Sequence, residues 1–202
     1  MDPNEVFKSE VARNIERLGS HHEIKQKSIE WIGDITALRY VYNFQWLGRP
    51  IIQVPQDMVA LQELIWAIKP DLVIETGIAH GGSLILSASM LALLDYCDAI
   101  ENGQTLEPRA TRRRVLGVDI GIRAHNRAAI EAHPMAHRID MIQGSSVATE
   151  VVAQVHEIGM EGHGLDVPDA GPLYGATFFL GEAFAGFTRF AEHLIQRVQR
   201  FQ

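Results

Sequence analysis

Short apolar runs that alternate with helical segments constrain the fold of this chain more than any other sequence feature. Three runs have the composition of strands buried on both faces: Leu72–Ile74, Val115–Ile120 and Ile139–Ile142. Segments with helical character follow them: Ser83–Leu94, Ala124–Ala132 and Val147–Ile158. Alternation of strands and helices is typical of a parallel sheet covered by helices. We therefore expect an α/β fold, with a Rossmann-like sheet and helices on both of its faces.

The segments before this alternation are different in character. Residues 1–30 are polar and predict a helical arm, with a helix from about Asn4 to Leu18 followed by a charged link around His21–Lys25. The aromatic residues from Tyr40 to Trp46 suggest a packed lead-in to the α/β domain, which we expect over residues 31–160. A helix is expected over Met58–Ile68, with Asp57 as its N-terminal cap and Pro70 after its end.

The segment after the alternation predicts an atypical C-terminal tail over residues 161–202. Gly159–Gly175 contains five glycines and two prolines where a fourth buried strand is due. Because Gly and Pro disfavour central strands, we expect an incomplete sheet, an exposed strand edge and association through residues 176–190. A final helix is expected from about Phe187. A reading-frame change, a truncation and a genuine variant all remain open as the origin of this tail.

Composition limits the partners and the compartment. The net charge of −7 argues against a nucleic-acid partner, because phosphate binding needs an excess of Lys and Arg. A single cysteine, Cys97, excludes an internal disulfide and a thiolate zinc cluster, and suits a cytoplasmic protein. The polar N-terminus is unlike a signal peptide, and no stretch approaches the roughly 20 apolar residues of a membrane span. Peripheral membrane contact and a homo-oligomer remain open.

The turn after the first strand is the strongest candidate for a ligand site. Glu75 ends the strand, where open parallel sheets bind ligands. Gly77 permits a sharp turn, and Gly81–Gly82 allow backbone amides to approach a ligand at the start of the next helix. Ser83 is expected to cap that helix. His80 is either a contact or gate at the edge of the ligand or a plain surface residue.

The spacing of this turn excludes two common nucleotide motifs. Ala79 breaks the dinucleotide pattern G-x-G-x-x-G, which disfavours an NAD-type dehydrogenase, and no Lys-Ser/Thr pair completes a phosphate-cradling loop. An acidic residue directly before a loose glycine turn suits a cationic amino-acid ligand such as S-adenosylmethionine better than a pyrophosphate. A structural turn without any ligand is the alternative.

Two later strand ends carry further candidates. Asp119 ends the second strand, where a carboxylate can accept hydrogen bonds from both ribose hydroxyls, although such residues often only cap loops. Gly144 and Ser145 follow the third strand and either line an adenine edge or form an ordinary turn before the next helix. Arg112–Arg114 precede the second strand and are expected to be a solvated approach to it, with an anionic-acceptor site as the alternative.

Several linked motifs resemble the cephalosporin hydroxylase / rhamnosyl O-methyltransferase family. The runs, which have the family's order and separations, are Phe44–Pro50, Pro55–Asp57, Lys69–Asp71, Glu75–Ser83, Gly117–Ile120 and Gln143–Ser146. The resemblance implies a class I methyltransferase fold, S-adenosylmethionine as cofactor, and methyl transfer to a hydroxyl of a sugar, glycolipid or antibiotic-like acceptor in lipid or polysaccharide biosynthesis. It assigns cofactor binding to Glu75, Gly77 and Asp119, with Gly81, Gly82 and Ser83 shaping the loop.

The sequence departs from this family after about residue 160. Members carry an Asp-Ser-Asn-His-like motif after the fourth strand, followed by acidic residues that hold a divalent metal such as Mg²⁺. No such motif follows here, and Asp166 and Asp169 lie in the Gly/Pro segment. We therefore name no catalytic residue and no metal ligand, and His21-His22-Glu23 does not suggest an iron site. The alternative function is a catalytically impaired cofactor-binding protein or fragment, and on this basis we expect weak methyl transfer without magnesium dependence.

Overall fold

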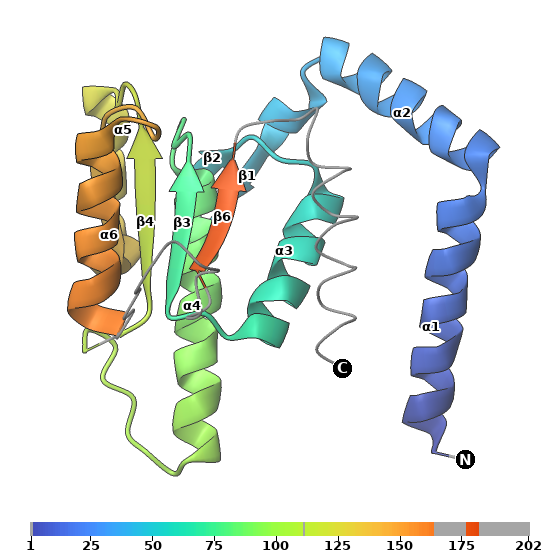
Figure 1. The fold of residues 1–202 in the computed structure, drawn as a ribbon, viewed down its shortest axis with the longest axis horizontal. Helices are drawn as coiled ribbons and strands as arrows, with labels where there is room; N and C mark the ends of the chain where they lie inside the picture. The colour runs from blue at the N-terminus through green and yellow to red at the C-terminus, as the bar shows by residue number, and fades with distance from the viewer. Residues whose placement is uncertain (1, 111, 164–176, 182–202) are drawn as a thin grey trace. The chain divides into compact units, whose positions relative to one another are not determined.

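The computed structural model describes residues 2–110, 112–163 and 177–181, and the chain divides into two compact units, Met1–Phe44 and Gln45–Gln202. The first unit contains helix α1 (Pro3–Ser20), helix α2 (His22–Ala37) and the short 3-10 helix η1 (Tyr40–Asn43) (Figure 1). The expected link after α1 is wrong. His21 instead caps α2, because its Nδ1 accepts a hydrogen bond from the backbone N–H of Ile24 at 3.4 Å. The domain limits at residues 30 and 160 stay predictions.

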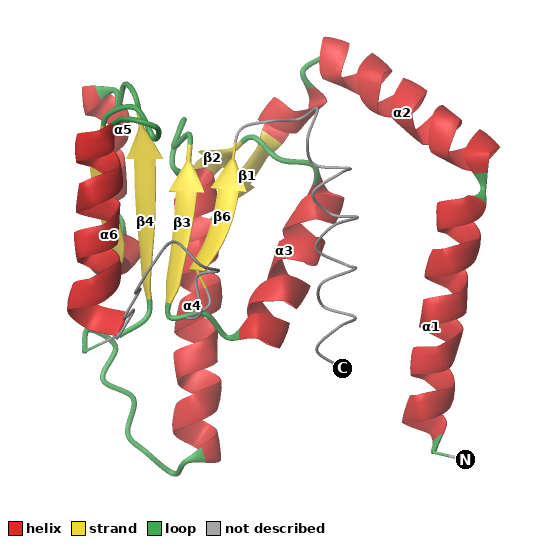
Figure 2. Ribbon diagram, in the orientation of Figure 1, coloured by secondary structure: helices red, strands yellow, loops and turns green. Residues whose placement is uncertain are grey.

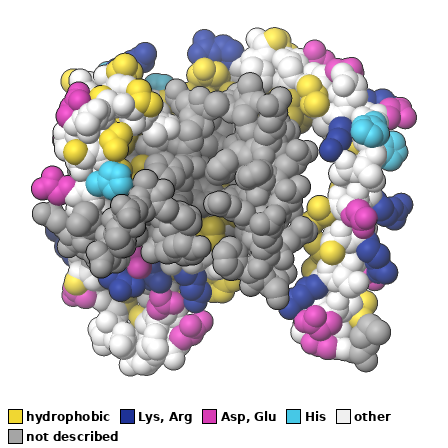
Figure 3. Space-filling view, viewed as in Figure 1, with side chains coloured by type: hydrophobic (Ala, Val, Ile, Leu, Met, Phe, Trp, Pro, Cys, Tyr) yellow, Lys and Arg dark blue, Asp and Glu magenta, His cyan; other side chains and the backbone are white. Residues whose placement is uncertain are grey.

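Neither helix of the first unit has a buried residue. Aromatic packing in this unit is concentrated at its C-terminal end. The centroid of the Tyr40 ring lies 6.3 Å from that of Trp31 and 5.1 Å from that of Phe44, both in edge-on arrangements. Apolar side chains are exposed on the N-terminal helices (Figure 3). This unit therefore consists of two exposed helices, with its aromatic packing at its C-terminal end.

The second unit is built around a parallel four-stranded sheet (Figures 1 and 2). Its strands are β3 (Leu72–Thr76), β4 (Arg114–Asp119), β5 (Ile139–Gln143) and β6 (Thr177–Gly181), in the order β5-β4-β3-β6. Each neighbouring pair is parallel, which confirms the expected α/β fold with a parallel sheet. A small two-stranded sheet, β1 (Phe44–Trp46) and β2 (Arg49–Ile51), precedes it.

The expectation of a missing fourth strand is wrong. β6 begins two residues after Gly175 and pairs with β3 from Leu72↔Thr177 to Thr76↔Gly181. Its sequence, Thr-Phe-Phe-Leu-Gly, is rich in the β-branched and aromatic residues that favour strands. The first part of the glycine-rich segment is also not a loop, because helix α6 (Thr149–His163) continues through Gly159 and Gly162. The expected final helix and the association segment, except residues 177–181, lie outside the described residues.

Helices cover both faces of the sheet, as expected. On one face, Leu116 and Val118 of β4 form a core cluster with Val151 of α6. On the other face, a Cβ added at Gly117 would lie 3.0 Å from Leu84 Cδ1 of helix α4 (Gly82–Glu101). Figure 1 shows α4 and α6 on opposite sides of the strands. Because the side chains of β4 alternate between these two covered faces, residues 115–118 of the strand are all buried and carry no polar side chain.

The described part of the second unit also contains α3 (Pro55–Ile68), α5 (Ala124–Glu131) and the 3-10 helix η2 (Pro134–Arg138). Helix α3 begins at Pro55 after Val54, so the expected capping role of Asp57 is wrong. Asp57 lies in the first turn, and burial raises the pKa of its carboxyl group. The helix ends as expected, because Lys69 adopts a left-handed conformation (φ 50°) and Pro70 follows.

One described helix, α4, has the length and composition that could cross a membrane, contrary to the expectation from the sequence. These two properties are also found in core helices of folded domains. In the structure Leu84, Leu91 and Leu94 of α4 are at most 2% exposed. The apolar character of α4 is thus accounted for by its packing on the sheet.

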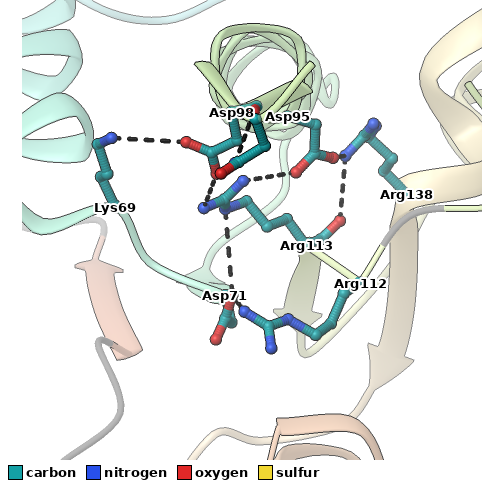
Figure 4. Close-up of polar contacts among 8 residues, drawn as sticks. Lys69, Asp71, Asp95, Asp98, Arg112, Arg113 and Arg138 are labelled. Atoms are coloured by element: carbon teal, nitrogen blue, oxygen red, sulfur yellow. Dashed lines mark hydrogen bonds and ion pairs between the residues drawn. The ribbon is translucent and has the colours of Figure 1, made fainter. Parts of the chain in front are cut away.

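A network of ion pairs lies at the amino ends of the strands and joins them to α4 (Figure 4). Arg113 is 9% exposed, and its Nη1 and Nη2 lie 2.6 Å from Asp95 and 2.7 Å from Asp98 of α4. Arg138, 2% exposed, shares Asp95 at 2.6 Å. The expectation that Arg112–Arg114 are merely solvated is therefore wrong for Arg113. Arg112 is exposed and pairs with Asp71 at 2.9 Å.

Candidate functional site

The order of the strands places a topological switch point beside β3. The chain continues from β3 through α4 to β4 on one side, whereas β6 joins β3 on its other side. In open parallel sheets, ligands bind outside the carboxyl ends of the strands at such a point. The turn after β3, which carries most of the predicted site residues, lies at this position.

The turn from Gly77 to Gly81 is held in an unusual backbone conformation. Gly77 and Gly81 have φ of 84° and 81°, which only glycine adopts readily, and Ala79 has φ of 46°. The N–H of Gly77 donates to the carbonyl of Val118 at 2.8 Å, and that of Gly81 donates to the carbonyl of Ile78 at 2.8 Å. The two glycines are therefore required by the shape of the turn itself, with or without a ligand.

Close packing within the protein also explains three of the glycines. A Cβ at Gly82 would lie 2.2 Å from the carbonyl oxygen of Pro50, and one at Gly81 would lie 2.4 Å from Ile130 Cδ1. A Cβ at Gly144 would lie 2.5 Å from Val151 Cγ2. A larger residue at position 82 would therefore disturb the packing of the core around Pro50 and Ile51. Cofactor contacts of these glycines stay predictions.

Glu75 and Ser83 face each other across the start of α4. Glu75 is 3% exposed and accepts a hydrogen bond from Ser83 Oγ. The expected capping role of Ser83 is wrong, because Gly81 is the N-cap and the helix has no side-chain cap. Among the described residues, no side chain caps the amides of the first turn of α4, which lie at the positive end of the helix dipole.

Asp119 joins the glycine turn to the loop after β4. Its Oδ2 accepts a hydrogen bond from the N–H of Ile78 at 2.7 Å, and its Oδ1 accepts one from the N–H of Gly121 at 2.8 Å. A carboxylate has about four acceptor positions, so each oxygen retains capacity for one more donor. Asp119 therefore has a structural role and can also bind a hydroxyl group.

Gly144 and Ser145 lie at the same edge, one strand farther from the switch point. Gln143 of β5 is in register with Asp119, and the N–H of Gly144 donates to the carbonyl of Asp119 at 2.9 Å. The carbonyl of Ser145 accepts from the N–H of Ala148, which leads into α6. The sheet thus brings all three predicted strand ends to one edge.

Two side chains that were not among the predicted site residues, Arg49 and Asn126, hold the glycine turn. The guanidinium of Arg49 donates to the carbonyl of His80 from Nε at 3.1 Å and from Nη2 at 2.5 Å. Asn126 of α5, 3% exposed, donates to the carbonyl of Ala79 at 2.7 Å. Arg49 lies in one of the runs that carry the family resemblance, whereas nothing in the sequence around Asn126 marks it. His80 contributes its backbone carbonyl to this arrangement.

We expect Asn126→Ala to loosen the glycine turn. The change leaves the carbonyl of Ala79 without its side-chain donor, which costs about 1–3 kcal/mol for a buried group. Hydrogen exchange of the amides of Gly77, Ile78 and Gly81, followed by mass spectrometry, should accelerate by roughly five- to a hundredfold. Asn102→Ala is the matched control, because the Asn102 amide donates to the carbonyl of Asp98 at an exposed position. Equal exchange in both variants would contradict the assigned role.

Comparison with known proteins identifies the family. The family described as Rhamnosyl O-methyltransferase/CmcI matches residues 38–165. The chain belongs to this family. The match covers β1 to α6 and stops before β6, so it contains the glycine turn, Asp119 and Arg49. No curated protein sequence matches the chain.

Solved structures with similar folds include CmcI and a bacterial methyltransferase. CmcI with SAH is 16% identical and covers 77% of this chain at a TM-score of 0.38, and CmcI with Mg-SAM is 15% identical and covers 78% at 0.41. An O-methyltransferase from Bacillus cereus in complex with SAH is 14% identical, with a TM-score of 0.38. The match covers 90% of this chain and 66% of the Bacillus cereus chain. The chain spans 60% and 53% of the two CmcI chains. These similarities are too distant to transfer residues or ligands.

The described residues do not provide a ligand set for a metal ion. Within residues 2–110, 112–163 and 177–181, no three His, Cys, Asp or Glu side chains gather in a way that could hold one. Asp166 and Asp169, the carboxylates of the Gly/Pro segment, lie outside the described residues. The divalent ion that the family resemblance implies therefore has no fit among the described side chains, and no chemical step is derived from it.

Proposed function

We propose that this chain binds S-adenosylmethionine at the carboxyl edge of β3 and β4 and transfers its methyl group to a hydroxyl. The juxtaposition of Asp119 with the glycine turn, through the 2.7 Å hydrogen bond from Ile78, carries this proposal. Asp119 would accept hydrogen bonds from the ribose hydroxyls. Glu75, on the neighbouring strand, would face the amino-acid end, directly or through water.

The remaining predicted residues shape the binding site. Gly77 and Gly81 set the path of the turn, and the uncapped amides at the start of α4, from Gly82 and Ser83, would face the ligand. Gly144 and Ser145 would line the adenine edge, and His80 would lie at its rim. The bound cofactor supplies an electrophilic methyl group. The residues of the chain hold the donor and exclude water, so that an acceptor hydroxyl can approach in line.

A sugar, glycolipid or antibiotic-like hydroxyl is the acceptor we propose, on the basis of the family to which the chain belongs. Participation in lipid or polysaccharide biosynthesis and a cytoplasmic location are proposals of the same kind. The expectation of weak transfer without magnesium dependence rests on the absent metal motif. β6 supplies a fourth strand, but the described residues still offer no ligand set for a metal ion. Transfer of a labelled methyl group to sugar hydroxyls, with and without magnesium, distinguishes an active enzyme from a cofactor-binding protein.

We expect Asp119→Ala to weaken the binding of S-adenosylhomocysteine by about ten- to a hundredfold. The substitution removes charge-assisted hydrogen bonds to the ribose worth about 1.5–3 kcal/mol. Isothermal titration calorimetry measures the change, and thermal unfolding establishes that the variant remains folded. Asp71→Ala is a matched control at the opposite edge of the sheet, where Asp71 pairs with the exposed Arg112.

Three results would contradict the proposed function. The unmodified chain would show no heat of binding with the cofactor, Asp119→Ala would bind as well as the unmodified chain, or NADH would bind more tightly than S-adenosylhomocysteine. The last outcome would favour a dehydrogenase. Since Asp119 also holds the glycine turn, a folded variant that loses only affinity is the decisive observation.

A further inference from the structure

Helix α1 has an exposed apolar stripe that nothing in its own unit covers. Phe7, Val11, Ile15 and Leu18 lie on one side of the helix and are 66%, 38%, 51% and 61% exposed. Helix α2 meets α1 at an elbow and does not lie along it (Figure 1). Helices of this length are marginal in water by themselves and usually depend on packing of an apolar face. The stripe therefore indicates a partner for α1.

Three residues of the stripe, Phe7, Val11 and Leu18, fit the a and d positions of a coiled-coil seam. The other two a and d positions of this seam are Asn4 and Asn14, and a polar residue at such a position favours one register at a cost in stability. Glu10 and Arg17 lie on one flank of this seam, one heptad apart. Lys8 and Ile15 occupy the other flank. Within the part of the chain that the structure describes, neither Glu10 nor Arg17 has an ion-pair partner.

We infer that α1 binds α1 of a second copy of this chain in an antiparallel pair. A two-fold axis near the middle of the helix places Phe7 against Leu18 of the partner subunit. In antiparallel pairs the same flanks face each other, so Glu10 lies opposite Arg17 of the partner subunit, and the symmetry repeats this ion pair. In a parallel pair, Glu10 would face the flank that carries Ile15 and would form no ion pair. Charge complementarity thus selects the antiparallel arrangement.

The inference is independent of the cofactor, since α1 belongs to the first unit and precedes the family match. A helix of this length offers a short seam, so we expect a reversible dimer. Sedimentation velocity of the full chain over a range of concentrations measures its dissociation constant. Glu10→Arg and Arg17→Glu should each weaken the dimer by roughly tenfold or more, because each creates two like-charge contacts.

Mixing the two variants is the sharpest test. Chains with Glu10→Arg carry two cations on this flank and chains with Arg17→Glu carry two anions, so an equimolar mixture should form a heterodimer at least as stable as the original homodimer. The double variant with both changes should recover the homodimer. Glu16→Arg is the matched control, because it makes the same charge change on the face opposite the stripe and should leave the dissociation constant unchanged.

Each alternative occupant of the stripe gives a different result. A chain that is monomeric at every concentration would overturn the inference and would favour docking of α1 on its own chain. A dimer that is insensitive to Glu10→Arg, or two variants that fail to rescue each other, would also overturn it and would point to another interface. Circular dichroism of each variant establishes that α1 remains helical.

Discussion

Arg113→Ala is expected to lower the free energy of unfolding by about 3 kcal/mol, because it breaks a largely buried ion-pair network and removes one cationic partner from Asp95 and from Asp98, which keep Arg138 and Lys69. Arg113 binds Asp95 and Asp98 of α4 from the first residues of β4 and thereby fixes the helix against the amino edge of the sheet. Urea denaturation followed by circular dichroism measures the loss. Arg112→Ala is the matched control, because its side chain is 69% exposed and should cost no more than about 1 kcal/mol.

The same network predicts a dependence on pH. Hydrogen bonding to Arg113 lowers the pKa of the Asp98 carboxyl below its ordinary value. A lowered folded-state pKa stabilises the protein above the unfolded-state value of about 4, and this contribution is lost as the pH falls through the folded-state pKa. The unmodified chain should therefore lose more stability than Arg113→Ala between about pH 5 and pH 2. If the free energy of unfolding fell by the same amount in both proteins over this pH range, the assignment would be contradicted.

Gly82→Val should destabilise the second unit by about 3 kcal/mol, because even the first carbon of the new side chain would lie 2.2 Å from the backbone carbonyl of Pro50. Relief requires β2 to move away from the start of α4, since a backbone oxygen cannot rotate aside. Cofactor binding should fall with stability, because Arg49 of β2 also holds the carbonyl of His80.

Gly121→Ala provides the control for this change. A Cβ at Gly121 meets no atom within 4 Å, so the free energy of unfolding should change by no more than about 0.5 kcal/mol. Denaturant titration of both variants separates the effects. If Gly82→Val had the stability of the original chain and lost only cofactor affinity, the glycine would serve the ligand and the packing argument would be wrong.

Much of the candidate site could be located from local sequence. Glu75 and Asp119 were expected at strand ends because the apolar runs before them are short and uninterrupted, and the structure brings both to the carboxyl edge of adjacent strands. The positive φ angles of Gly77 and Gly81 agree with the expected sharp turn. These features depend on a few consecutive residues, which is the range over which sequence patterns are informative.

The fourth strand could not be recognised by the same reasoning. Thr177–Gly181 is short, and the glycine-rich segment before it suggested that no strand would follow. Its place is beside β3, which is more than a hundred residues earlier in the chain. Pairing with a distant strand edge decides such a segment, and that edge is visible only after the sheet has formed.

The sequence by itself determined the parallel α/β class, the glycine turn and the identity of the strand-end carboxylates, because apolar periodicity and glycine placement act over neighbouring residues. The tertiary structure alone decided why Gly82 must be small, why Arg113 is buried, and that Arg49 and Asn126 hold the turn. Each of these depends on atoms brought together from distant parts of the chain. The sequence does not reveal whether a polar side chain is hydrogen-bonded to water or to a backbone carbonyl, because its partner depends on how distant segments pack.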